Sequence, residues 1–166
     1  MKSTTIIAAG TALLLLSGCK HHEKHKVSEA DATKLADDML ATLRTNDVAK
    51  IDALYAPDAV SIDPVKTDIV VGSEGIHQLN AAYAAMKMDK VENVDRHITI
   101  PDGDDVIVTG KANISSSANP AAKPQQFRYT EVFHKAKGED GTFKIIAEHV
   151  SFAAPAAAAA PEPAKP

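Results

Sequence analysis

The sequence predicts an α+β domain in which three N-terminal helices are wrapped by a curved antiparallel sheet. Two observations support this fold class. Apolar residues recur at helical spacing in the first half of the domain, and β-branched residues gather in runs after Asp89. Turn-forming residues separate those later runs at regular intervals. Helices that come first and an antiparallel meander that comes last indicate an α+β arrangement around one hydrophobic core.

Each predicted helix begins at a residue that can cap it. Ser28 begins the first helix, Asp47 the short second helix and Ser73 the third. Asp31 completes a capping box with Ser28, and Pro57 is expected to end the second helix. The predicted apolar stripes contain Ala32, Leu35, Ala36, Met39, Leu40 and Leu43 in the first helix, and Ile76, Leu79, Tyr83 and Met86 in the third.

Two short strands and four long strands make up the predicted sheet. The short strands lie on either side of Asp63-Pro64, and the long strands follow the third helix. Their predicted ranges are 59–63 and 67–71 for the short strands, and 91–100, 106–115, 125–136 and 143–152 for the long ones. The long strands must curve to cover the first helix. We therefore expect a cone with a pocket at the wide end of the sheet.

The start of the chain is typical of an exported protein. Lys2 precedes an uncharged run that is rich in Ile, Ala and Leu and too short to span a bilayer, which indicates a secretory signal. The run ends in Leu16-Ser17-Gly18-Cys19. These four residues resemble the lipobox of bacterial lipoproteins, in which the cysteine is acylated and becomes the new N-terminus. The resemblance implies that residues 1–18 are a signal peptide and that Cys19 carries acyl chains such as palmitate.

Lipidation of Cys19 would fix the location of the domain. Several acyl chains anchor a protein stably in a membrane. Lys20 stands where an inner-membrane retention signal would have Asp, so the common sorting rule implies the periplasmic face of the outer membrane. Cys19 is the single cysteine, so the exported domain must depend on its core and not on an internal disulfide.

Three segments are expected after the signal peptide. Residues 19–27 form a His/Lys-rich tether, residues 28–152 the folded domain, and residues 153–166 a disordered Ala/Pro tail. The formal net charge of −4, without a cluster of Lys and Arg in the domain, excludes nucleic acid as a partner. No metal-binding Cys pair or Gly-rich phosphate loop is present, so no metal site and no cofactor are predicted.

The tether allows a separate hypothesis of metal handling. His-rich tracts bind Zn²⁺, Cu²⁺ or Ni²⁺, and the tether contains His21, His22 and His25. A flexible strip without fixed geometry is a weak metal site, so a solvated tether is the favoured interpretation.

Two sets of residues carry a resemblance to a known superfamily. Tyr55-Ala56-Pro57-Asp58-Ala59-Val60, followed by Asp63-Pro64 and Gly72-Ser73-Glu74-Gly75-Ile76, resembles the first half of the nuclear transport factor 2-like superfamily. Arg128, Thr130, Val132, Phe133 and His134, followed by Phe143-Lys144-Ile145-Ile146 and His149-Val150-Ser151, is similar to the last two strands of SnoaL-like proteins and of the kinase association domain. The resemblance implies a cystatin-like cone over residues 28–152.

This superfamily includes ketosteroid isomerases and polyketide cyclases, and the resemblance suggests a general base. Asp63 is similar to the isomerases' catalytic aspartate. However, Met39 falls where the isomerases have an oxyanion tyrosine. Their second oxyanion group falls on Thr130 or, after a slip of one residue that would turn it to the other sheet face, on Glu131. A lost oxyanion donor costs about 10²–10³ in rate, so steroid isomerisation is disfavoured.

The last strand offers a second group of candidates. Simple alternation places His149 and Ser151 on the same face as Phe143, where Arg128 and Thr130 from the preceding strand could join them around a carboxylate or hydroxyl of a ligand. Structural interpretations stay open: His149 and Ser151 can satisfy one another. Asp63 can initiate a turn before Pro64. Tyr55 and Tyr83 are predicted at the core or the rim of the pocket, where they could contact a ligand.

Two orientations of the strand over residues 125–136 compete. The resemblance turns Arg128 and Thr130 inward, whereas hydrophobicity turns Phe127, Tyr129 and Phe133 inward. Both hold if the outer sheet face is itself buried, and relatives in this superfamily dimerise through that face. We therefore expect a homodimer.

The sequence favours one function and leaves an alternative. The favoured function is that of a membrane-anchored periplasmic lipoprotein whose SnoaL-like domain binds a small molecule or a partner protein without catalysis. The alternative is an acid/base enzyme of the ketosteroid isomerase or polyketide cyclase type that uses Asp63 and His149, since histidine titrates near neutral pH.

Overall fold

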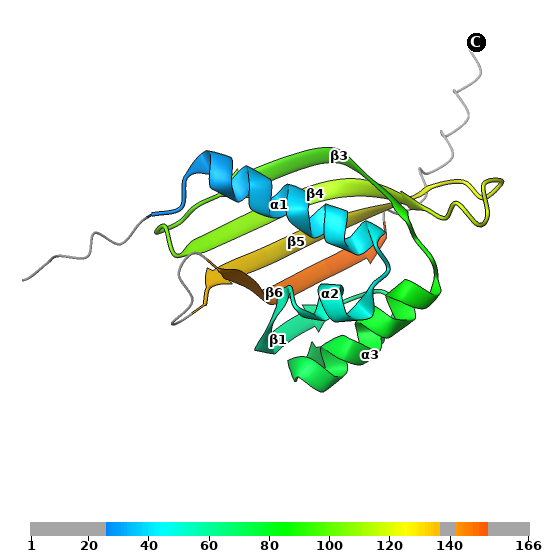
Figure 1. The fold of residues 1–166 in the computed structure, drawn as a ribbon, viewed down its shortest axis with the longest axis horizontal. Helices are drawn as coiled ribbons and strands as arrows, with labels where there is room; N and C mark the ends of the chain where they lie inside the picture. The colour runs from blue at the N-terminus through cyan, green and yellow to red at the C-terminus, as the bar shows by residue number, and fades with distance from the viewer. Residues whose placement is uncertain (1–25, 137–141, 153–166) are drawn as a thin grey trace, which may run out of the picture.

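The structure is a computed structural model that describes residues 26–136 and 142–152, and it confirms the predicted fold class (Figure 1). Its elements are α1 (Glu29–Arg44), α2 (Val48–Asp52), β1 (Tyr55–Ile62), β2 (Val70–Val71), α3 (Gly72–Ala85), β3 (Lys90–Thr99), β4 (Asp105–Ser115), β5 (Gln125–Lys135) and β6 (Phe143–Phe152). The predicted signal peptide, Cys19, the three tether histidines and the Ala/Pro tail lie outside the described residues.

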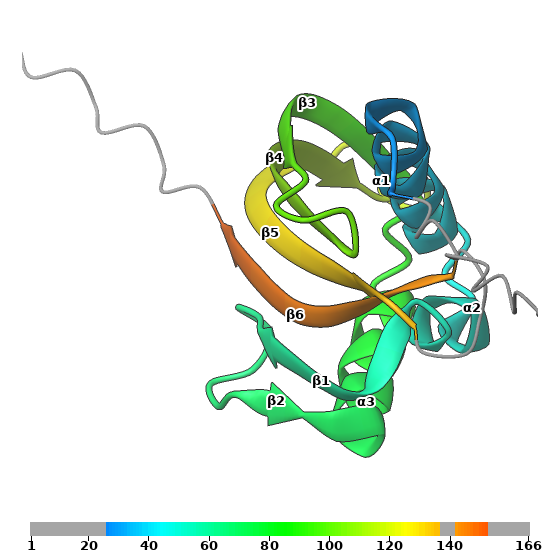
Figure 2. The same ribbon diagram turned by 90° about the vertical axis from the view of Figure 1, so that its left-hand side faces the viewer.

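The six strands form one sheet in the order β2-β1-β6-β5-β4-β3. Every neighbouring pair is antiparallel except β1 and β6, which run parallel although they come from opposite ends of the domain. The sheet curves strongly, and the helices lie on its concave side (Figure 2). Helix α1 lies across the long strands, and α3 lies beside β1 (Figure 1).

The first two helices begin as predicted. In α1, Ser28 Oγ accepts a hydrogen bond from the Asp31 amide at 3.1 Å, and Asp31 accepts one from the Ser28 amide at 3.4 Å, so the capping box is complete. In α2, the Asp47 side chain accepts from the Lys50 amide at 3.3 Å.

The prediction for the third helix was wrong in its cap. Val71 occupies the N-cap position and makes no side-chain capping bond. The Ser73 hydroxyl instead donates to the Pro57 carbonyl at 3.2 Å, which ties α3 to β1. Pro57 itself does not end α2, because that helix already ends at Asp52 and Pro57 lies within β1. A short helix can therefore end without a proline.

The four long strands lie within one residue of their predicted ranges, whereas the short strands overlap theirs but differ in length. Strand β1 begins at Tyr55, and β2 is reduced to Val70–Val71. Between them Asp63 makes the predicted turn, since its carboxylate accepts a hydrogen bond from the Val65 amide at 2.7 Å.

The main core lies between α1 and the concave face of the sheet. Helix α1 contributes Ala32, Ala36, Met39 and Leu40, and the strands contribute Val91, Val106, Val108, Ala112, Ile114, Phe127, Tyr129, Phe133 and Ile145. The Arg44 guanidinium at the end of α1 donates to the Val91 carbonyl, at 2.8 Å from Nε. A second contact joins α2 to α3. Asp52 at the end of α2 accepts a hydrogen bond from the Asn80 side chain at 2.9 Å and lies 2.7 Å from His77 Nδ1.

The orientation of β5 follows hydrophobicity. Phe127, Tyr129 and Phe133 are buried beneath α1, and Arg128 is exposed on the convex face. The inward orientation that the resemblance implied for Arg128 and Thr130 is therefore wrong. Burying the aromatic row gains far more apolar area than burying the polar set. Because α1 already covers this row, a dimer is not needed to shelter it.

A β-bulge in β6 overturns the predicted alternation of the last strand. Phe133 pairs with Ile145, but the next residue back, Val132, pairs with Ala147, so Ile146 is an extra residue in β6. Beyond the bulge, Glu148 pairs with the inward-facing Glu131. His149 and Ser151 consequently lie on the convex face and not on the face of Phe143.

Candidate functional site

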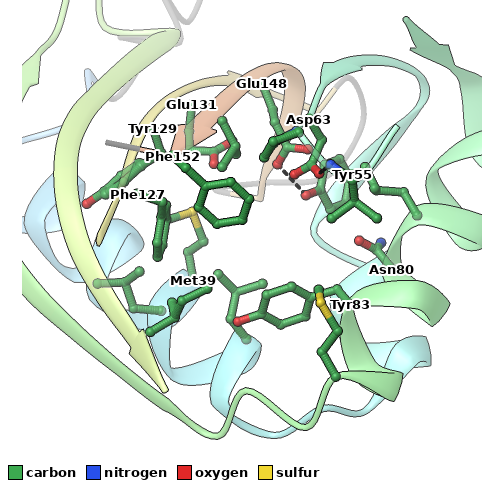
Figure 3. Close-up of a pocket in the computed structure, with 18 residues that line it drawn as sticks. Met39, Tyr55, Asp63, Asn80, Tyr83, Phe127, Tyr129, Glu131, Glu148 and Phe152 are labelled. Carbon is green, nitrogen blue, oxygen red and sulfur yellow. Dashed lines mark hydrogen bonds between the residues drawn. The ribbon is translucent and has the colours of Figure 1, made fainter. Parts of the chain in front are cut away.

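A cavity of about 70 Å³ lies at the wide end of the cone, between α1, α3 and the sheet (Figure 3). Its walls are mostly apolar, with Met39 and Leu43 from α1 and Leu79 from α3. Ligand pockets commonly measure about 300–1,000 Å³, so this cavity lies well below the usual range and excludes a four-ring skeleton.

Three carboxyl groups meet at one end of the cavity. Glu131 on β5 and Glu148 on β6 are direct cross-strand partners, and Asp63 follows β1. Figure 3 shows the three on one side of the cavity and Tyr83 on the opposite side. Glu131 is 4% exposed and Glu148 is 9% exposed, so both carboxyl groups are removed from water. We call these three residues the acidic end.

The two buried glutamates differ in their hydrogen bonds. Glu148 accepts a hydrogen bond from Tyr55 Oη at 2.6 Å on one oxygen and from the buried Ser61 hydroxyl on the other. In contrast, Glu131 Oε2 is buried without a hydrogen-bond partner among the described residues. The same is true of the Tyr83 hydroxyl across the cavity. Buried polar atoms are seldom left unpaired. These two atoms therefore mark places where a bound ligand could supply the missing hydrogen-bond partner.

Burial raises the pKa of every acidic group at this end. The pKa of Glu131 is raised well above its ordinary value, first by burial and then by the nearby charges of Glu148 and Asp63. Burial also raises the pKa of Glu148, although hydrogen bonds from Ser61 and Tyr55 oppose the shift. Glu131 has no such donors in the described parts of the chain, so it is the group that keeps its proton most readily.

The pKa values of the neighbouring groups shift in the same direction. Burial raises the pKa of Asp63, against a hydrogen bond from the Val65 amide. Burial, with a contribution from Asp63, raises the pKa of Tyr83 to about 12. Burial followed by the charge of Glu148 raises the pKa of Tyr55 well above its usual value. No Lys, Arg or His lines the cavity among the described residues, so no cation counters the acidic end.

The structure divides the predicted site residues between the two sheet faces. Tyr55, Asp63 and Tyr83 line the cavity. Arg128, Thr130, His149 and Ser151 instead line an open hollow on the convex face, together with His97 and Thr109. Asp63 and His149 are therefore not brought together, because the sheet lies between their side chains.

Sequence reasoning missed most of the acidic end. Glu131 was reached only through a one-residue slip of the resemblance, and Glu148 was not considered. A signal for Glu131 was present, because it stands in strict alternation with Phe127, Tyr129 and Phe133. For Glu148 the bulge at Ile146 hides the same signal.

Two further features bear on function. No group of three or more His, Cys, Asp or Glu side chains within residues 26–136 and 142–152 is placed to hold a metal ion. None of the helices in the described ranges is both long and apolar enough to cross a membrane.

Comparison with known proteins agrees with this geometry. The model of the SnoaL-like domain matches residues 36–146. None of the curated proteins matches the sequence significantly. Among solved structures, a ketosteroid isomerase-like protein from Erwinia carotovora atroseptica superimposes with a TM-score of 0.64 at 15% identity, covering 76% of this chain and 96% of that one.

Two other solved structures are more similar in sequence. A putative calcium/calmodulin dependent protein kinase II association domain from Xanthomonas campestris is 27% identical, with a TM-score of 0.62 over 80% of this chain and 96% of that one. A nuclear transport factor 2-like protein from Cytophaga hutchinsonii is 25% identical, with a TM-score of 0.59 over 76% of this chain and 100% of that one. With the family model matched over most of the domain, the chain belongs to the SnoaL-like family.

Proposed function

We propose that this SnoaL-like domain binds a small organic molecule in the cavity at the wide end of the cone, and that it does so without changing the molecule chemically. The observation that supports this proposal is an apolar cavity with one polar end, at which a buried oxygen of Glu131 has no partner. Pockets that bind small molecules combine apolar walls with a few convergent polar groups.

The mouth of the cavity suits the entry of an apolar body. Val65, Met86 and Phe152 line the cavity and remain 40%, 37% and 42% exposed. Large apolar side chains are costly to leave in water, and these three line the same cavity. A ligand that places an apolar group between them covers surface that is otherwise exposed.

Methyl NMR of the full chain in a non-ionic detergent tests this proposal against a panel of single-ring fragments. We expect hits to shift the methyl resonances of Met39, Leu43 and Leu79, which line the cavity. The methyl groups of Val132 and Ile107, on the convex face, serve as the internal control. Shifts confined to the convex face, or no shifts for any fragment, would overturn the proposal.

The anchor is the second part of the proposed function. The lipobox-like segment before Cys19 supports attachment to the envelope membrane, with the domain in the periplasm. Metabolic labelling with radioactive palmitate and membrane fractionation test it. We expect Cys19→Ser to lose the label and to leave the membrane fraction, with Ser17→Ala as the matched control that keeps both. Membrane attachment of the unlabelled Cys19→Ser variant would contradict the anchor.

A homodimer through the convex sheet face is also proposed. Val60, Ala147, Val132 and Ile107 pair in one row across β1, β6, β5 and β4, and this apolar row faces away from the helices. Structural neighbours include a kinase association domain and a kinase hub. Sedimentation of Val132→Lys, which puts a charge in the row, should show monomer, whereas Arg128→Lys should sediment as the wild type. A monomeric wild-type protein would contradict this proposal.

A second candidate function is acid/base chemistry on a small ketone. Asp63 lines the cavity with a raised pKa and could remove a proton from the carbon next to the carbonyl, with neutral Glu131 donating to the carbonyl oxygen. Deuterium exchange into cyclohexanone in heavy water tests it, and Asp63→Asn should abolish the exchange. Background exchange rates with the wild-type protein would remove this candidate.

A further inference from the structure

We infer that the molecule bound in the cavity is a small organic cation, an amine whose ammonium group sits among the carboxyl groups of Asp63, Glu131 and Glu148. This inference rests on the proposed function, and it adds the chemical class of the ligand. Three features of the cavity support it: the convergence of the carboxyl groups, the unpartnered oxygen of Glu131, and the aromatic walls.

The carboxyl groups converge from three separate parts of the chain. Glu131 and Glu148 come from neighbouring strands, and Asp63 comes from the turn between β1 and β2. Tyr55 and Ser61 supply hydroxyl donors, and both donate to Glu148. The acidic end therefore gathers three carboxyl groups, and within the described residues one oxygen of Glu131 is left without a hydrogen-bond donor.

Glu131 is the carboxyl group to which a cation would supply the missing hydrogen-bond donor. Its side chain lines the cavity, is 4% exposed, and has an oxygen without a partner among the described residues. A buried carboxylate is stable only when it is paired and hydrogen-bonded. An ammonium group has three donors and no acceptor, so it can donate to the unpartnered oxygen of Glu131 without needing an acceptor in return.

The aromatic walls also suit a cation with an apolar body. Tyr83, Phe127 and Phe152 line the same cavity as the carboxyl groups. Their rings can pack on the apolar body of the ligand, and the negative face of an aromatic ring attracts a nearby ammonium group. An anionic ligand would instead meet like charges without a Lys, Arg or His in the lining to offset them.

A neutral hydrogen-bond acceptor, such as a ketone, is the competing ligand class. Its affinity would depend on pH in the opposite direction from that of a cation. A ketone needs Glu131 to be protonated, so its affinity would fall as the pH rises. A cation needs ionised carboxyl groups, so its affinity rises with pH. Five titratable groups face Glu131: Glu148 from β6, Tyr55 from β1, Asp63 from the turn, Tyr83 from α3 and Tyr129 from β5. The charges of Asp37 and Arg96 act in turn on Tyr129. Helix α1 contributes apolar side chains to the lining.

The test uses three probes that share one body and differ in charge: 2-phenylethylamine, 2-phenylethanol and phenylacetate. Each is titrated into the full chain in a non-ionic detergent, and binding is followed by the methyl shifts of Leu43 and Leu79. We expect the amine to bind at least about tenfold more tightly than the alcohol at pH 7, and the carboxylate to bind weakest. Between about pH 5 and pH 8 the affinity of the amine should rise about tenfold.

Variants with matched charge changes complete the test. Glu131→Gln should weaken the amine about tenfold and leave the alcohol within about threefold. Glu92→Gln, an exposed carboxylate on β3, removes the same charge away from the cavity and should change neither affinity. Tighter binding of the alcohol, or amine affinity that falls with pH, would overturn the inference while leaving the proposed binding function intact. If no probe and no other fragment shifts the cavity methyl groups, the proposed function fails together with it.

Discussion

Strands β5 and β6 carry polar side chains on both faces of the sheet, and these side chains are exposed on one face and buried on the other. On the convex face, Arg128, Thr130 and His149 lie around an open hollow, within reach of water. On the concave face, Glu131 and Glu148 are almost fully buried, and within the described part of the chain only Glu148 has hydroxyl donors. The convex residues look more like a binding site in the sequence, yet the concave ones are held in the costlier environment. Because an unpaired buried carboxyl group is costlier than an exposed polar side chain, the concave residues are the stronger candidates for a site.

The largest expected effect is on the free energy of unfolding, and it is tested at two adjacent residues that face opposite sides of the sheet. Phe133 is 1% exposed in the core, whereas its neighbour Val132 lies on the convex face. We expect Phe133→Ala to lower the free energy of unfolding by about 4 kcal/mol and Val132→Ala by less than about 1.5 kcal/mol. Chemical denaturation of the full chain measures both. Equal losses would show that the convex face is buried as deeply as the concave one.

The second expected effect comes from the carboxyl group of Glu131. Its folded-state pKa lies above the ordinary 4.5, so the folded state binds more protons than the unfolded chain, and stability falls as the pH rises above that value. Glu131→Gln removes this loss. We expect the variant to be more stable than the wild type by about 1–2 kcal/mol at pH 7 and to lose the advantage below about pH 4.5. Thermal unfolding across this pH range measures it.

The exposed Glu92→Gln variant is the control for that experiment. It removes the same charge from the convex side of β3 and should shift stability by less than about 0.5 kcal/mol at either pH. A destabilised Glu131→Gln variant at pH 7 would mean that the carboxylate of Glu131 is ionised and satisfied in the free protein.

A smaller effect is expected at a half-buried carboxylate that has partners. Asp52 lies 2.7 Å from His77 Nδ1, and this hydrogen bond, followed by the charge of Asp52, raises the pKa of His77. The contribution of the pair to stability is full below pH 6.5 and is lost as the pH rises through the raised pKa. In Asp52→Asn the pKa of His77 should return toward 6.5, as followed by NMR titration of the ring. An unchanged titration would show that the pair does not form in solution.

The smallest effect is expected on the convex face. Arg128→Ala and His149→Ala remove side chains that are exposed there and that do not line the cavity. We expect each to change stability by less than about 0.5 kcal/mol and to leave fragment binding in the cavity unchanged. Loss of binding in either variant would move the site to the convex hollow and reverse the comparison between the faces.

The sequence predicted the elements better than the site, and the reasons are physical. Caps and periodicity are local, so the capping box at Ser28 and the four long strands could be read directly. The facing of β6 depends on one extra residue, Ile146, which no local pattern marks. In β5, the aromatic alternation indicated the correct face, and only the resemblance argued for the other. The acidic end was hidden because a carboxylate is expected to face water.

The hydrogen bond from Tyr55 to Glu148 joins residues 93 positions apart, because the parallel pair of β1 and β6 brings the two ends of the domain together. Such distant pairings are slow to form, whereas α1 and the hairpins of β3, β4 and β5 can form from nearby segments. As the chain emerges from the ribosome N-terminus first, β1 can pair early with the short β2, but it must wait for β6 to gain its long sheet partner. The acidic end is thus completed last, so partly synthesised chains contain most of the fold and none of the finished cavity.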